Sequence, residues 1–188
     1  MLATLTIPCM DNHYIATTAR CRLRNARPCD YDDLVAAVEA PAFPAALPLA
    51  VMYRQAKLAG WFDAMLNKAA AAEVCWLSIE SDSVTTQQCI GQISFVRLDR
   101  QGCWNLAFWL HPDYWHQGLA AEAAGAAIEF AKMHFDIEDI VAADADWNTS
   151  SMKMLARLGL TRLEDGTPLF GGNAGEGIHI FGRVGRRA

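Results

Sequence analysis

"HPDYWHQGLAAEA", residues His111 to Ala123, is the stretch that decides the fold. It places bulky aromatic residues directly before Gly118 and a series of alanines. Glycine in the first turn of a helix costs stability relative to alanine, so we infer that the chain needs exposed backbone there. The N–H groups at a helix start lack intrahelical partners, and together with the helix dipole they attract anions. The stretch therefore predicts a diphosphate-binding loop between a strand and a helix, with Leu119 buried behind it.

Other phosphate-binding loops are excluded by the sequence. The chain contains no G-x-x-x-x-G-K-[ST] segment and no G-x-G-x-x-G segment after a strand, which are the patterns of two common nucleotide-binding turns. The glycine-rich segment 171–177 follows no strand–turn–helix pattern, so we interpret it as a hairpin loop.

Composition and length indicate one folded domain. With 188 residues, 53% apolar and 20% charged, the chain can bury a core and does not belong to the disordered class. We assign residues 1–19 to an N-terminal extension and residues 20–188 to a single domain. The formal net charge of −5 argues against a nucleic-acid partner, because such partners favour a basic surface.

The sequence also argues against membrane and metal partners. No apolar run reaches the roughly 20 residues that span a bilayer, and residues 1–19 lack a basic segment and a cleavage site of the secretory kind. We therefore expect a cytoplasmic location. The six cysteines and five histidines show no ligand spacing, so we expect no metal site. A homodimer is left open.

Hydrophobic periodicity gives the element order β-α-α-β-β-β-α-β-α-β-β. Antiparallel strands followed by a strand–helix–strand unit predict an α/β (α+β) fold, in which a mixed sheet of about six to seven strands is flanked by about four helices. The expected strands are 20–26, 73–80, 89–98, 103–110, 138–145, 160–163 and 178–184, and the expected helices are 30–40, 49–72, 117–133 and 148–158.

Two segments resemble a known family. Residues 112–123 resemble the acetyl-coenzyme A motif of the GNAT superfamily, particularly its RimJ/RimL branch of ribosomal-protein N-terminal acetyltransferases, which typically reads P-x-Y-W-G-x-G-Y-A-T-E-A. The matching residues are Pro112, Tyr114, Trp115, Gly118, Ala120, Glu122 and Ala123. Residues 144–160 are similar to the family pattern N-x-x-S-x-x-[VL]-L-x-x-L-G-F, matched by Asn148, Ser151, Leu155, Leu158 and Gly159. The resemblance covers about residues 20–184 and implies a GNAT-like fold with a mostly antiparallel central sheet.

The resemblance implies acetyl-coenzyme A as co-substrate, lying between the strand that ends at Leu110 and the strand that ends at Ala145. A backbone N–H near Leu110 would polarise the thioester carbonyl. Two residues are the catalytic candidates: Asn148 would bind the pantetheine arm or the acceptor backbone, and Ser151 would protonate the departing thiolate. The implied co-substrate-binding residues are Leu110, Trp115, His116, Gln117, Gly118, Leu119, Ala120, Asn148 and Ser151.

Some positions depart from the family pattern. His116 stands where the branch usually has glycine, and Asn105 stands where some relatives have a glutamate that could act as general base. His111, Glu80 and Asp146 are the substitute bases, and the sequence does not rank them. An α-amine, with a pKa of about 8, is partly neutral at cellular pH, whereas a lysine amine of about 10.4 needs more help from a base.

The predicted function is transfer of acetyl from acetyl-coenzyme A to a primary amine. A protein N-terminal α-amine is the first acceptor, and a small-molecule amine such as an amino acid, polyamine or aminoglycoside is the alternative. The acceptor pocket would be built from residues 41–72 and the C-terminal hairpin. The missing carboxylate at Asn105 leaves a non-catalytic coenzyme A sensor open, and a nucleotide-binding module that prefers ATP is a third class.

Overall fold

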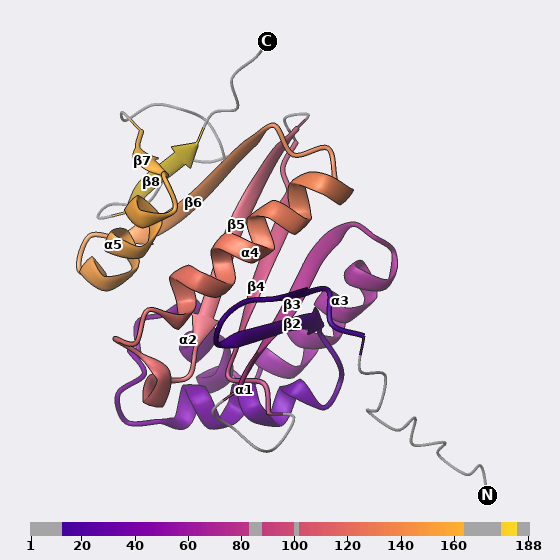
Figure 1. Cartoon of the computed structure of the whole chain (residues 1–188). Coiled ribbons are helices and arrows are strands. Elements are labelled where there is room, and N and C mark those ends of the chain that lie inside the picture. The colour runs from indigo at the N-terminus through magenta and orange to yellow at the C-terminus, as the bar shows by residue number, and fades with distance from the viewer. Residues whose placement is uncertain (1–12, 83–87, 100–101, 164–177, 184–188) are drawn as a thin grey trace, which may run out of the picture.

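One mixed β-sheet of eight strands organises the chain (Figure 1). The computed structural model describes residues 13–82, 88–99, 102–163 and 178–183. The strands lie in the order β1-β2-β3-β4-β5-β6-β8-β7, and each neighbouring pair is antiparallel except β5–β6. The strands are β1 (Ala16–Thr17), β2 (Cys21–Asn25), β3 (Val74–Ser81), β4 (Gly91–Arg97), β5 (Cys103–Leu110), β6 (Asp139–Ala145), β7 (Thr161–Arg162) and β8 (Ile178–Arg183). The predicted mixed, mostly antiparallel sheet is confirmed.

Helices cover both faces of this sheet. They are α1 (Asp30–Glu39), α2 (Pro48–Arg54), α3 (Leu58–Ala70), α4 (Leu119–His134) and α5 (Thr149–Arg157), with a 3-10 turn η1 at Pro112–Tyr114. The strand β3 is buried along its whole length because its side chains alternate between two cores. Leu77 and Ile79 pack with α4 and α5 on one face, and Val74 and Trp76 pack with α1–α3 on the other.

Two details differ from the sequence-based prediction. The helix expected over 49–72 is two helices, because Ala56 adopts a left-handed φ of 55° and the N–H of Lys57 closes the end of α2 on the carbonyl of Met52 at 2.8 Å. The second detail is β1, a strand of two residues within the segment assigned as N-terminal extension, which pairs with β2. The number of strands and the number of helices are each one higher than the upper expectation for these reasons.

Membrane and metal features are absent from the part of the chain that the structure describes. No helix there is long and apolar enough to cross a bilayer, and no group of three His, Cys, Asp or Glu side chains could hold a metal ion. The glycine-rich segment 171–177 lies outside the described residues.

A buried ion-pair network fixes α1 to the sheet. The guanidinium of Arg24, on β2, is 1% exposed and makes two hydrogen bonds to Asp30 and one to Glu80. Ser78 donates to the same Asp30 carboxylate at 2.7 Å and accepts from Gln92 at 3.1 Å. These polar contacts connect β2, β3 and β4 beneath α1. The single guanidinium of Arg24 holds the two buried carboxylates of Asp30 and Glu80 in place.

Replacement of Arg24 by alanine should therefore be severely destabilising. We expect Arg24→Ala to lower the free energy of unfolding by about 3–5 kcal/mol, because Asp30 and Glu80 are left buried without a counter-ion. Arg97→Ala is the matched control, since Arg97 lies 3.6 Å from Asp136 in an exposed pair, and it should cost less than about 1 kcal/mol. Urea denaturation of both variants measures the difference, and equal losses would contradict this role for Arg24.

Candidate active site

The strands β5 and β6 diverge, and this divergence creates the candidate site. Their parallel pairing consists of Cys103–Asp139, Trp104–Ile140 and Asn105–Val141. Beyond these pairs β5 continues to Leu110 and β6 to Ala145 without pairing, and Figure 1 shows the two strands fanning apart. The facing backbone edges in this region consequently have no strand partner among the described residues. The family resemblance implies the co-substrate at this position.

The amide of Leu110 points into this divergence. The next residue, His111, donates its backbone N–H to Ile90 at 2.8 Å, on the β4 side. Because successive backbone amides of a strand point to opposite sides, the N–H of Leu110 points toward β6, where no described residue accepts it. The carbonyl of Leu110 faces the same side and accepts from the indole Nε1 of Trp115 at 2.7 Å. Among the described residues, the end of β5 therefore carries a backbone donor without a partner, and the use of this donor by a thioester carbonyl stays a prediction of the family resemblance.

The start of α4 presents a second set of free donors. Gly118 is the N-cap residue, has a left-handed φ of 79° and offers no side-chain cap. The first helical hydrogen bond runs from Glu122 to the Gly118 carbonyl at 3.1 Å, so the N–H groups of Leu119, Ala120 and Ala121 have no partner among the described residues. Leu119 is buried as expected, whereas the three preceding residues, 116–118, are exposed. The geometry fits an anion at this helix start.

Backbone conformation explains two residues of this loop. A β-carbon on Gly118 would lie 3.6 Å from the guanidinium of Arg20, which is an ordinary contact, so the left-handed φ rather than lack of space requires glycine. His116 has a φ of 61° and stands where the similar family usually has glycine. The histidine therefore adopts a conformation that glycine would reach at lower cost.

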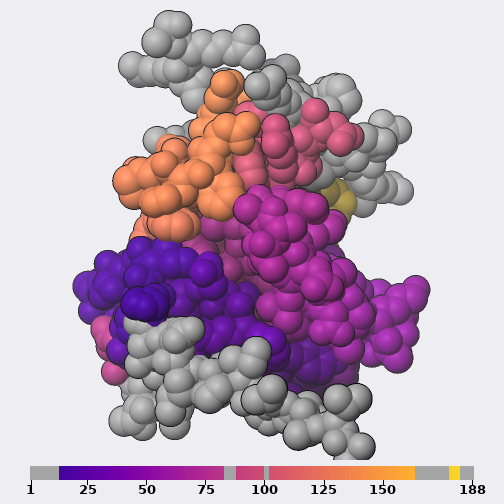
Figure 2. Space-filling view, turned by 90° about the vertical axis from the view of Figure 1, so that its right-hand side faces the viewer, coloured from indigo at the N-terminus to yellow at the C-terminus, as the bar shows by residue number. Residues whose placement is uncertain are grey.

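Arg20 and Glu122 hold the loop in place, and the sequence analysis missed this function. Arg20 donates to the backbone carbonyl of Gln117 at 2.8 Å and forms an ion pair with Glu122 at 2.6 Å. Thr18 donates to the same carboxylate at 2.6 Å. The contact joins the turn between β1 and β2 to the first turn of α4, and Figure 2 shows the N-terminal segment lying against the α4 region. No local pattern could reveal it, because Arg20 and Gln117 are 97 residues apart.

Asn148 and Ser151 are brought together at the start of α5, on the diverging side of β6. The Asn148 side chain caps α5 by accepting from the backbone N–H of Ser151 at 3.4 Å. Its amide nitrogen donates to Asp144 at 2.9 Å. Asp144 is 8% exposed, and burial raises its pKa, against the opposing influence of Ser151, Asn148, the Ala145 backbone N–H and His179. The sequence analysis passed over this carboxyl group.

The three candidate bases are otherwise engaged or exposed. Glu80 is 2% exposed and hydrogen-bonded to Arg24 and Tyr14. The Nδ1 of His111 accepts the backbone N–H of Asp113 at 3.3 Å, which caps η1. Asp146 is exposed in the turn after β6. None of the three is a buried, free base beside Ser151.

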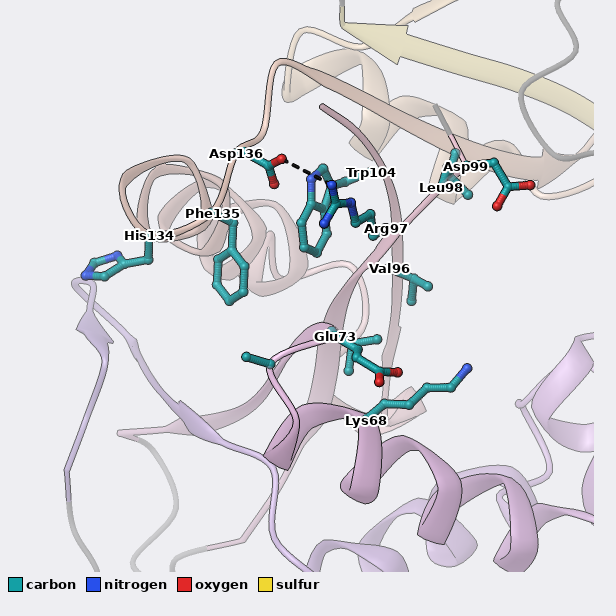
Figure 3. A pocket seen from close by; sticks show the side chains of 12 residues that line it. Lys68, Glu73, Val96, Arg97, Leu98, Asp99, Trp104, His134, Phe135 and Asp136 are labelled. Carbon is teal, nitrogen blue, oxygen red and sulfur yellow. Dashed lines mark ion pairs between the residues drawn. The ribbon is translucent and has the colours of Figure 1, made fainter. Parts of the chain in front are cut away.

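A separate hollow lies at the opposite end of β4 and β5 (Figure 3). It has a volume of about 670 Å³ and is lined by Lys68, Arg97, Trp104, Asp136 and their neighbours. Within it, the Arg97–Asp136 ion pair is 3.6 Å long. None of the residues predicted to bind the co-substrate lines this hollow, so it is not the candidate site.

Comparison with known families gives a match over most of the chain. The family described as acetyltransferase (GNAT) domain matches residues 20–161. No protein of curated function matches the chain.

Solved structures share the fold at low sequence identity. RimL, the ribosomal L7/L12 α-N-protein acetyltransferase in complex with coenzyme A, superposes with a TM-score of 0.67 and 13% identity, covering 92% of this chain and 98% of that one. The ribosomal-protein-S5-alanine acetyltransferase of Vibrio fischeri gives 0.63 and 15%, with 91% and 96% covered. RimJ of Mycobacterium smegmatis, in complex with a coenzyme A disulfide, gives 0.63 and 15%, with 87% and 81% covered. At these identities the likeness establishes the fold.

The contact between Glu122 and the N-terminal turn should depend on pH. The hydrogen bond from Thr18 and the interactions with Arg20 hold the pKa of Glu122 below its usual value of 4.5. Its ionised form therefore stabilises the fold above the unfolded pKa, and this contribution is lost as pH falls through the lower folded pKa. We expect Glu122→Gln to melt below the wild type at pH 7, and the difference in Tm to shrink progressively as the pH falls below 4.5 and through the lower folded pKa. Glu129→Gln, at an exposed position of the same helix, is the control. A difference that persists unchanged at low pH would contradict the electrostatic contact.

Proposed function

Because this chain belongs to the acetyltransferase (GNAT) domain family, we propose that it transfers acetyl from acetyl-coenzyme A to a protein N-terminal α-amine. The family establishes an acyltransferase that uses acetyl-coenzyme A as co-substrate. The acceptor, the assignment of individual residues and a cytoplasmic location belong to the proposal. One observation carries it: β5 and β6 part just where the uncapped start of α4 supplies free N–H groups.

The two sets of donors match the two ends of the co-substrate. The N–H groups of residues 119–121, next to the Gly118 turn, suit a diphosphate, because a helix start favours negative charge. His116 and Gln117 complete the exposed loop that would border it. The N–H of Leu110 suits the thioester carbonyl, and a fixed donor at that position stabilises negative charge that develops on the oxygen. Acetyl-coenzyme A supplies the activated acyl group and a thiolate leaving group.

The residues at the ends of β5 and β6 would complete the site. Trp115 is fixed by its hydrogen bond to Leu110 and lies 6.3 Å, between ring centroids, from Phe43 of the segment after α1. The region that binds the amine substrate would therefore begin at the ring pair of Trp115 and Phe43. Asn148 would position the pantetheine arm or the acceptor backbone, and the hydroxyl of Ser151 would return a proton to the departing thiolate.

The choice of an α-amine rests on chemistry and on the relatives. With His111, Glu80 and Asp146 engaged or exposed, the site suits an amine that needs little deprotonation. An α-amine, with a pKa of about 8, meets this requirement better than a lysine amine of about 10.4. One structural neighbour, RimL, is named an α-N-protein acetyltransferase of ribosomal L7/L12. The net charge of −5 also supports a partner other than nucleic acid.

The test of this function is release of coenzyme A thiol from acetyl-coenzyme A with a panel of acceptors. The panel contains N-terminal peptides, the same peptides with a blocked α-amine and a free lysine, amino acids, polyamines and aminoglycosides. We expect release with the free α-amine peptides and none with the blocked ones, after subtraction of a no-acceptor control. Release of coenzyme A thiol with small amines alone would overturn the acceptor proposed here. If no acceptor of the panel gave release although acetyl-coenzyme A bound tightly, the non-catalytic sensor would be favoured.

The helix start can be tested by charge at Gly118. Gly118→Asn and Gly118→Asp have the same shape, and both residues tolerate the left-handed backbone better than most. Two like charges about 4 Å apart repel by about 1 kcal/mol in water and about 4 kcal/mol near a protein surface. We therefore expect Gly118→Asp to bind acetyl-coenzyme A at least about tenfold more weakly than Gly118→Asn, with a difference that narrows at high salt.

Calorimetry measures this comparison directly. Gly60→Asp is the control for net charge, because Gly60 is exposed on α3 with nothing within 4 Å of its added β-carbon, and it should bind like the wild type. Equal affinities of Gly118→Asn and Gly118→Asp would place the diphosphate elsewhere.

A further inference from the structure

Asp144 is a buried carboxyl group that the proposed site leaves unexplained. It lies on the part of β6 that has parted from β5 and is 8% exposed. One oxygen, Oδ1, accepts from the amide nitrogen of Asn148 at 2.9 Å and from the Ala145 N–H at 3.0 Å. The other, Oδ2, is buried, and no residue in the described part of the chain makes a hydrogen bond of normal geometry to it. A buried carboxylate oxygen without a partner is costly, and such groups in a native protein often serve a functional purpose.

Ser151 is linked to Asp144 through the side chain of Asn148. Ser151 and Asn148 both act to lower the pKa of Asp144 against the effect of burial. The backbone N–H of Ser151 donates to Asn148 at 3.4 Å, so Asp144, the Asn148 side chain and the Ser151 backbone form one connected unit across the β6–α5 turn. The titratable group that faces Asp144 from the neighbouring strand is His179, its cross-strand partner on β8. The start of α5 contributes two neutral residues, the N-cap Asn148 and Ser151.

We infer that Asp144 is a positioning residue for acetyl transfer: it orients the amide of Asn148 and the hydroxyl of Ser151, and it stores the proton that Ser151 passes on. This inference rests on the proposed function of the site. An ionised Asp144 draws the hydroxyl hydrogen of Ser151 toward itself, which turns the oxygen lone pairs of Ser151 outward. The serine then serves as a proton acceptor before it serves as a donor.

In this arrangement every proton that is released during the reaction is taken up again. As the amine nitrogen bonds to the acetyl carbon it loses one proton to Ser151 Oγ, while the hydroxyl proton of Ser151 moves to Asp144. As the carbon–sulfur bond breaks, sulfur takes a proton from Ser151 Oγ, and Asp144 returns its proton to the serine. One proton leaves nitrogen and one reaches sulfur, and both side chains end as they began. A carboxyl group whose pKa is raised by burial suits this temporary storage.

The first test needs no substrate. In the protein labelled with carbon-13 at aspartate carboxyl groups, NMR should give Asp144 a pKa above the usual 3.8. Ser151→Ala should raise the pKa of Asp144 further, because a hydrogen bond to the ionised form is lost. Ser150→Ala, at the exposed neighbouring position of α5, should leave it unchanged. An identical titration of Asp144 in wild type and Ser151→Ala would overturn the coupling.

The second test uses turnover with an acceptor that the wild type acetylates. Asp144→Asn keeps an oxygen for Asn148 but presents a donor to Ser151, which reverses the direction of that contact. We expect kcat to fall about tenfold or more, the KM for acetyl-coenzyme A to change little, and the acid limb of the kcat profile due to Asp144 to disappear. Asp136→Asn, an exposed aspartate that lines the hollow at the opposite end of the sheet, should behave like the wild type.

The outcomes separate the inference from the function on which it rests. A wild type that acetylates no amine overturns the proposed function, whatever the NMR titration gives. An active wild type whose Asp144→Asn variant keeps its kcat and its acid limb overturns the inference alone. A folded Asp144→Asn variant that instead loses affinity for acetyl-coenzyme A, at unchanged kcat, would make Asp144 a binding residue and would likewise overturn the positioning role.

Discussion

The short parallel pairing of β5 with β6 is the constraint on which the rest of the site depends. Three residue pairs hold the two strands together, and the pairing then stops at Asn105 and Val141. An intact sheet would satisfy the backbone edge of β5 internally, whereas the divergence leaves the N–H of Leu110 without a partner among the described residues. The fold thus keeps an unsatisfied strand edge at its centre, and a ligand with an acceptor atom is the natural partner for it.

The surrounding elements keep this divergence rigid and supply its chemistry. On one side, Arg20 and Glu122 tie the N-terminal turn to the first turn of α4, so the uncapped helix start has a fixed position. On the other side, Asn148 closes the start of α5 beside Asp144. Beneath α1, the buried contacts of Arg24 fix the helical layer on the other face of the sheet. Each anchor joins segments that are distant in sequence, so the site is a property of the whole domain.

The sequence predicted those features that depend on short-range patterns. The Gly118 turn, the burial of Leu119 and the Asn148 cap follow from residue type and local position, and the structure confirms all three. Three other features have no local signal. Ala56 ends α2 in a left-handed conformation although alanine favours helix, Arg20 reaches a carbonyl 97 residues away, and Asp144 lies within an apolar strand, where its partners come from the helix that follows. Tertiary contacts decide such positions.

Hydrogen exchange of backbone amides on addition of acetyl-coenzyme A tests the central claim most directly. The account predicts slower exchange at Leu110 and at residues 119–121, because these N–H groups have no protein partner among the described residues and would gain one from the co-substrate. Exchange at Leu98 and Asp99, which line the hollow at the opposite end of the sheet, should not change. Protection of that hollow, with none at Leu110 or the start of α4 at saturating acetyl-coenzyme A, would contradict the account.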